Sequence, residues 1–155
     1  MNNTSYSIIK YGKLTTIYIL SLFYIVVGIK HFTDTDFFIM LIPDFFSLHY
    51  EIVLISGFFE IILGLLILIN KTRRIASWGL IILLICVFPA NIYLYLSDHV
   101  REILEISKKQ ALLRIPFQIP LIIIAYWHSK ENSKEWFSYL CLLIFIPTIL
   151  YFINL

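Results

Sequence analysis

The chain has 155 residues, of which 60% are hydrophobic and 14% are charged, and its formal net charge is +2. Average soluble domains are about 45–50% apolar and about 25% charged, and a soluble domain this small could not bury so much apolar surface. The sequence does not support nucleic-acid binding, because its 12 basic residues are nearly balanced by 10 acidic ones and form no basic run. The composition predicts an integral membrane protein.

Five segments are apolar and long enough to approach the roughly 20 residues that a spanning helix needs. In chain order they are Leu14–Ile29, Ile52–Ile69, Ile75–Leu96, Ala111–His128 and Trp136–Ile153. The fold class predicted from them is an all-α polytopic membrane helix bundle. The last segment contains Pro147, and it either crosses fully or lies along the interface; we expect full crossing because it carries no charge.

Lysine and arginine residues are unevenly distributed between the two ends of the predicted spans. The end that holds the amino terminus collects seven of them, and the other end has four together with seven of the ten acidic residues. Cytoplasmic loops are enriched in Lys and Arg. We therefore expect a multi-pass protein of the cell membrane whose amino terminus is cytoplasmic.

Polar side chains recur in the outer half of the predicted bundle. Glu60 lies at the middle of its span, Gln118 about 2 Å outward of the midplane, and Asn91 and Arg114 about 8 Å outward. His31 lies at the outer end of the first span. Ionisable groups at membrane depth are costly and usually mark a function or a partner. Our hypothesis is that these groups converge on one outward-opening polar pocket.

A structural alternative stays open for the same residues. Glu60 and Arg114 could form a buried ion pair that fixes helix register, with Asn91 and Gln118 holding helices together.

Small and helix-breaking residues lie near the polar ones. Pro89 and Pro116 each remove a backbone hydrogen bond, and such broken backbone is tolerated at depth only inside protein or beside a wet cavity. Gly57 and Gly64 flank Glu60, and packing is the simplest interpretation of them.

Known catalytic and metal-binding motifs are missing from the sequence. It contains no C-x-x-C, no H-E-x-x-H and no phosphate-binding glycine loop. The sequence predicts no metal site and leaves open whether the chain is an enzyme; at most it is a subunit of a membrane oxidoreductase.

Five short stretches, in order, resemble the DoxX-like family of integral membrane proteins. The family patterns are G-x-x-H-F followed by P, S-G-x-x-E, R-R-x-A with a later G, F-P-A-N, and R-x-P-x-Q. Here they read G-I-K-H-F at 28–32 with Pro43, S-G-F-F-E at 56–60, R-R-I-A at 73–76 with Gly79, F-P-A-N at 88–91 and R-I-P-F-Q at 114–118. The resemblance runs from Gly28 to Trp127.

The resemblance implies a four-helix membrane protein linked with membrane redox systems. It divides the chain into a cytoplasmic amino terminus (residues 1–13), a four-helix DoxX-like membrane domain (residues 14–128) and an extra carboxy-terminal membrane helix (residues 129–155). The family's polar signature maps onto the residues already singled out by depth, which are His31, Glu60, Asn91, Arg114 and Gln118.

The function that we expect is that of a redox-associated membrane subunit with a quinone-like or other amphipathic ligand. Arg114, Asn91 and Gln118 could donate hydrogen bonds to quinone carbonyls, and Glu60 could relay a proton. Electrons would come from a partner oxidoreductase in the bilayer. The alternatives are a non-catalytic scaffold or assembly factor whose polar cluster is structural, and a small transporter or channel, for which the sequence shows no inverted repeat.

Overall fold

The computed structural model describes residues 3–153. Within that range the regular structure is entirely helical, and five helices are long and apolar enough to cross a membrane. They are α1 (Asn3–Thr33), α3 (His49–Leu66), α4 (Arg73–Leu96), α6 (Lys108–His128) and α7 (Glu135–Ile153). The predicted all-α polytopic bundle is confirmed, and the chain is a multi-pass membrane protein.

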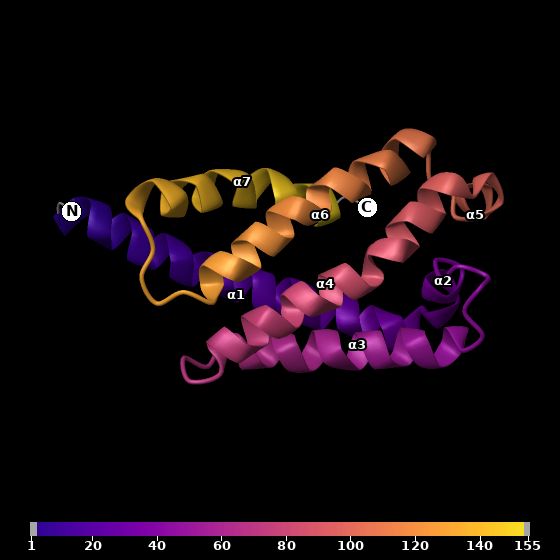
Figure 1. Ribbon diagram of the computed structural model, residues 1–155, viewed down its shortest axis with the longest axis horizontal. Helices are drawn as coiled ribbons and strands as arrows, with labels where there is room; N and C mark the ends of the chain where they lie inside the picture. The colour runs from indigo at the N-terminus through magenta and orange to yellow at the C-terminus, as the bar shows by residue number, and fades with distance from the viewer. Residues whose placement is uncertain (1–2, 154–155) are drawn as a thin grey trace.

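The most extensive contacts join long helices that follow one another along the chain. α1 packs most extensively against α3, and α4 against α6, while α7 lies against both α6 and α1. Figure 1 shows that the two pairs diverge toward the end that holds the short helices α2 (Thr35–Ile39) and α5 (Asp98–Ile103). We call this the α2–α5 end. The opposite end, with the start of α1 and the connections at residues 67–72 and 129–134, is called the basic end.

Two features of the helices differ from the sequence prediction. α1 begins at Asn3, well before Leu14, because the polar residues that precede the apolar run continue the same helix instead of leaving it. From the sequence we predict no helix in the connections between the first and second spans and between the third and fourth, but each contains a short helix. Ser97 caps α5, since its hydroxyl accepts a hydrogen bond from the backbone N–H of Val100.

The start of α6 follows directly from its sequence. Ser107 accepts a hydrogen bond from the backbone N–H of Gln110, and the Gln110 side-chain oxygen accepts one from the backbone N–H of Ser107. This reciprocal arrangement satisfies two N–H groups that a helix start leaves open. It fixes the register in which α6 presents Arg114 and Gln118 to the bundle.

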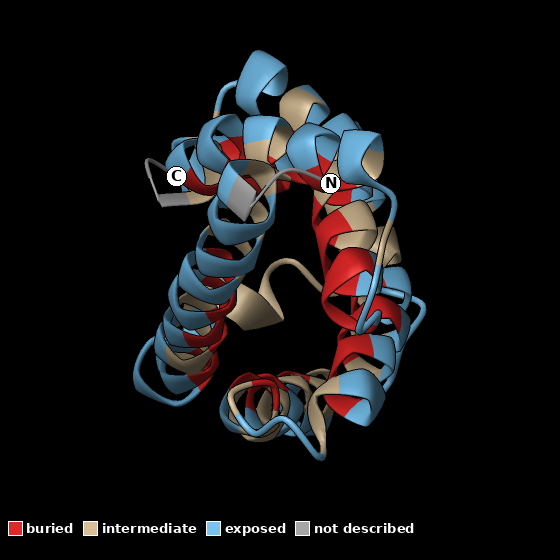
Figure 2. Ribbon diagram, turned by 90° about the vertical axis from the view of Figure 1, so that its left-hand side faces the viewer, coloured by how far each residue is buried: buried red, intermediate tan, exposed pale blue. Residues whose placement is uncertain are grey.

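Buried residues lie on the inner sides of the helices, and exposed residues lie on the outer sides (Figure 2). The main core is centred on Leu20, Leu80 and Ile124, which are fully buried. A second, smaller core at the α2–α5 end contains Leu94, with Met40 packed against it. The segment after α2 therefore joins the α1–α3 pair to the α4–α6 pair at that end.

Glycines allow α1 and α3 to approach closely. A Cβ atom placed on Gly57 would lie 2.5 Å from Cβ of His31 and 2.9 Å from the carbonyl oxygen of Gly28. Farther along, the Ser21 hydroxyl donates a hydrogen bond to the carbonyl oxygen of Gly64 at 2.6 Å. The packing role predicted for Gly57 and Gly64 is confirmed.

Candidate functional site

His31 and Glu60 form the first polar pair. The close crossing of α1 and α3 at Gly57 brings the Nδ1 atom of His31 to 3.3 Å from Oε2 of Glu60. Both residues are buried, at 7% and 8% exposure. The His31 Nδ1 atom also lies 2.9 Å from the carbonyl oxygen of Val27 on its own helix. Oε2 of Glu60 has no hydrogen-bond partner in the described chain, so this oxygen can still accept a hydrogen bond.

The short helix α2 covers the first pair. The ring of Phe38 stacks on the imidazole of His31, with 3.7 Å between ring centroids. Because α2 contacts both α1 and α3, it holds this aromatic cover in place. The contact orients His31 toward Glu60 and separates the pair from the outside of the bundle.

Asn91 and Gln118 form the second polar pair and connect α4 to α6. The Asn91 side-chain nitrogen donates a hydrogen bond to Oε1 of Gln118 at 2.9 Å. The Gln118 side-chain nitrogen donates another to the carbonyl oxygen of Leu84. This carbonyl lies beside that of Ile85, which lacks its usual helical donor because residue 89 is proline. Gln118, which is only 2% exposed, therefore binds α4 where its backbone is irregular.

Arg114 lies one turn before Gln118 on the buried face of α6 and is 9% exposed. Its Nε atom has no hydrogen-bond partner, and no carboxylate lies within 4 Å of its guanidinium in residues 3–153. The nearby Tyr151 stacks on Phe117 and donates its hydroxyl hydrogen to the carbonyl oxygen of Gln110 at 2.8 Å. A guanidinium carries five N–H donors. Arg114 thus brings a buried donor, its Nε–H group, into the bundle, and the described chain supplies no acceptor for it.

The five predicted residues are therefore arranged as two pairs and a separate arginine. The buried ion pair between Glu60 and Arg114, considered as the structural alternative, does not form: the basic group beside Glu60 is His31. The positions of Glu60 and Arg114 along their spans did not imply contact, because α3 packs on α1 and α4 and not on α6. No hydrogen bond or ion pair joins the two polar pairs to each other within the described chain. Convergence on one outward-opening pocket stays a prediction.

Sequence reasoning missed a buried polar contact near the basic end. Nε2 of His128 lies 2.9 Å from the hydroxyl oxygen of Thr16, which joins α6 to α1. His128 had been noted only as a residue at a span end. A comparison of residue depths along the spans could have predicted this contact. α1 and α6 run in opposite directions, and Thr16 lies near the level of His128.

Metal-binding side chains do not cluster in the part of the chain that the structure covers. Across residues 3–153, no three His, Cys, Asp or Glu side chains are placed to share a metal ion.

One protein family has a sequence profile that matches residues 20–129. It is described as a domain of unknown function, DUF8561. The chain belongs to this family. The matched region extends from α1 to the end of α6 and includes all five predicted site residues, whereas α7 lies outside it. No match is found among curated proteins or among solved structures.

Membership of DUF8561 carries no activity with it, and none of these comparisons links the chain to DoxX-like proteins. The site must therefore be interpreted from its own chemistry.

Proposed function

We propose that the chain is a DoxX-like, redox-associated subunit of the cell membrane that binds an amphipathic ligand with a carbonyl-bearing head, of which a quinone is the best example. The amino terminus is cytoplasmic in this proposal, in accordance with the excess of Lys and Arg at the basic end. The α2–α5 end then faces outward, and the polar pairs lie in the outer half of the bilayer.

The observation that supports the proposal is the buried Nε–H donor of Arg114, which has no hydrogen-bond partner in the described chain. A buried charge in a spanning segment is expensive unless it finds a partner, and the described chain offers the Nε–H group of Arg114 no acceptor. Carbonyl oxygens of a ligand head would accept its hydrogen bonds, while an apolar tail would pack among the surrounding hydrophobic side chains. The resemblance of the five sequence motifs to DoxX-like proteins points to the same ligand class.

The pair His31–Glu60 gives the proposal its proton chemistry. Reduction of a quinone to a quinol consumes two protons as well as two electrons. Glu60 has one oxygen without a hydrogen-bond partner and lies beside an imidazole, so the pair can pass a proton to a reduced head group. The electrons come from a partner oxidoreductase, because the sequence carries no flavin, haem or dithiol motif.

Thermal unfolding of the purified protein in neutral detergent, with and without added quinone, tests the proposal. Wild type should be stabilised by the quinone, and Arg114→Met should lose the stabilisation while remaining folded. Lys109→Met is the matched control, since it removes a positive charge from an exposed site on the same helix. A wild-type protein whose unfolding temperature does not respond to quinones would contradict the proposal.

A scaffold or assembly factor is the second candidate, and the Asn91–Gln118 hydrogen bond favours it. This pair is engaged between α4 and α6, as expected of side chains that only hold helices together. A Glu60→Leu/Arg114→Met double variant separates the two functions. Full complementation of a deletion strain by that variant would favour the scaffold over the ligand-binding subunit.

A further inference from the structure

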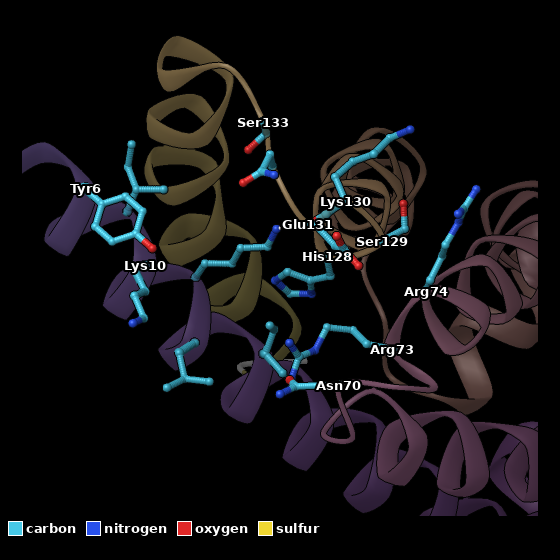
Figure 3. A pocket seen from close by; sticks show the side chains of 15 residues that line it. Tyr6, Lys10, Asn70, Arg73, Arg74, His128, Ser129, Lys130, Glu131 and Ser133 are labelled. Carbon is cyan, nitrogen blue, oxygen red and sulfur yellow. Dashed lines mark hydrogen bonds between the residues drawn. The ribbon is translucent and has the colours of Figure 1, made fainter. Parts of the chain in front are cut away.

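A second polar region lies at the basic end, away from the five candidate site residues. A cavity of about 900 Å³ is bounded by the start of α1, the start of α4, the end of α6 and the connection that follows α6 (Figure 3). Cavities that hold small ligands commonly measure about 300–1,000 Å³. The cavity is therefore large enough for a lipid head group.

The charge around this cavity is strongly one-sided. Glu131 supplies the single carboxylate of its lining, and no ion pair neutralises it or the cations in residues 3–153. The formally positive residues that line it are Lys10, Lys13, Arg73, Arg74 and Lys130. Five cations around one cavity make it a site for an anion.

Several of these cations have donors to spare. Arg73 uses Nε and Nη2 on the carbonyl oxygens of Ile67 and Leu68, where they cap the end of α3, and Nη1 remains. Lys10, Arg74 and the ammonium group of Lys130 form no hydrogen bond or ion pair within the described chain. The ammonium groups of Lys10 and Lys130 lie over aromatic rings, 6.0 Å from the ring centroid of Tyr6 and 4.6 Å from that of Tyr126 respectively. Phosphate oxygens are the acceptors that such a group of cations favours.

His128 adds a buried polar atom to the cavity wall. The residue is 2% exposed, and Figure 3 shows its ring beside Arg73. The Thr16 hydroxyl donates its hydrogen to the carbonyl oxygen of Lys13 at 2.9 Å. Nε2 of His128 must therefore be the donor in its 2.9 Å contact with Thr16. Nδ1 is left as an acceptor with no partner, and a hydroxyl group of a ligand would satisfy it.

Apolar side chains distinguish a lipid from a free phosphate. Ile9, Leu14 and Ile17 of α1 line the same cavity as the cations. The cavity also lies where the hydrophobic helices α1, α4 and α6 have their basic ends, which is the level of the head groups in a bilayer. A soluble phosphate would leave the apolar part of the wall exposed to water, whereas a glycerolipid would cover it.

From these contacts we infer that the cavity at the basic end binds the head group of an anionic phospholipid that carries a hydroxyl group, of the phosphatidylglycerol type. Arg73 donates to the phosphate, the positive charges of Lys10, Arg74 and Lys130 around the cavity attract it, Nδ1 of His128 accepts from the head-group hydroxyl, and the acyl chains leave along α1. Basic pockets between membrane helices recognise anionic head groups in this way. The site is separate from Arg114 and does not depend on the function proposed above.

Titration of the detergent-solubilised protein with phosphatidylglycerol in mixed micelles, followed by thermal unfolding, tests the phosphate contacts. Phosphatidylglycerol should raise the unfolding temperature, and phosphatidylcholine should not. The triple variant Lys10→Gln/Arg74→Gln/Lys130→Gln should need on the order of 100-fold more phosphatidylglycerol for the same effect. The control triple variant Lys30→Gln/Lys108→Gln/Lys109→Gln removes the same charge from exposed positions at the α2–α5 end and should respond like wild type.

Phosphatidylethanol tests the contact with His128, because its phosphodiester has the same charge and no head-group hydroxyl. Wild type should respond to it at a higher mole fraction than to phosphatidylglycerol, and His128→Phe should lose that difference. Equal responses of wild type to the two lipids would overturn the assignment of the hydroxyl to His128.

Two further outcomes would overturn the lipid site as a whole. One is an equal loss of the phosphatidylglycerol response in both triple variants, which would mean that general charge and not the cavity attracts the lipid. The other is stabilisation by inorganic phosphate or glycerol 3-phosphate equal to that by phosphatidylglycerol, which would identify a soluble anion as the ligand.

Discussion

Substitution of Gly57 by alanine tests the helix crossing that positions His31 and Glu60. The new Cβ atom would lie 2.5 Å from Cβ of His31 and 2.9 Å from the carbonyl oxygen of Gly28. Both atoms belong to or adjoin the backbone of α1, so the clash cannot be relieved by rotating a side chain. Overpacking of this kind typically costs about 1–3 kcal/mol. We expect Gly57→Ala to lower the free energy of unfolding by that amount.

Gly79→Ala is the matched control for this experiment. A Cβ atom there would lie 2.5 Å from Cδ2 of Leu63, which is the tip of a flexible side chain that can move away. Its effect should stay within about 0.5 kcal/mol. Reversible unfolding in mixed micelles, followed by circular dichroism, measures both variants. Equal stability of the Gly57→Ala and Gly79→Ala proteins would refute the crossing of α1 and α3 at Gly57.

Two other predictions concern the second polar pair and the orientation of the chain. In a double-mutant cycle on the free energy of unfolding, Asn91→Leu and Gln118→Leu should show a coupling energy of about 0.6 kcal/mol and at most about 1.7 kcal/mol. Other hydrogen bonds between membrane helices have couplings of this size. Additive effects would mean that the two side chains do not interact. The orientation is tested by single cysteines in a protein without its two native cysteines. Lys71→Cys should react with a membrane-impermeant thiol reagent only from the cytoplasmic side, and Lys109→Cys should react only from outside. The reverse pattern would contradict a cytoplasmic amino terminus.

The sequence predicted the number of long helices because an apolar run of spanning length has few other stable conformations in a bilayer. It did not predict where α1 begins. Most residues from Asn3 to Lys13 are polar, and hydropathy detects the part of a helix inside the membrane without detecting its continuation outside. The short helices α2 and α5 were missed because they have too few residues to give the hydropathy signal of a membrane span.

For the candidate site, the sequence predicts only the depth of each residue in the membrane. Counting residues along a span gives the depth of Glu60 and Arg114, but it does not give the direction in which each helix turns its face. The glycines of α1 and α3 determine that direction for Glu60, and they place it against His31. Asn91 and Gln118 were expected at different depths, but their contact forms because α4 and α6 pack along each other and turn the two side chains toward one another.

In the proposed function, the acceptor for the buried donor of Arg114 is a ligand from outside the chain. Solvent extraction and mass spectrometry of gently purified protein measure this directly, as moles of quinone per mole of protein. We expect near-stoichiometric quinone in wild type and in Lys109→Met, and at least tenfold less in Arg114→Met. Equal amounts of quinone in all three preparations, or none in wild type, would contradict the claim.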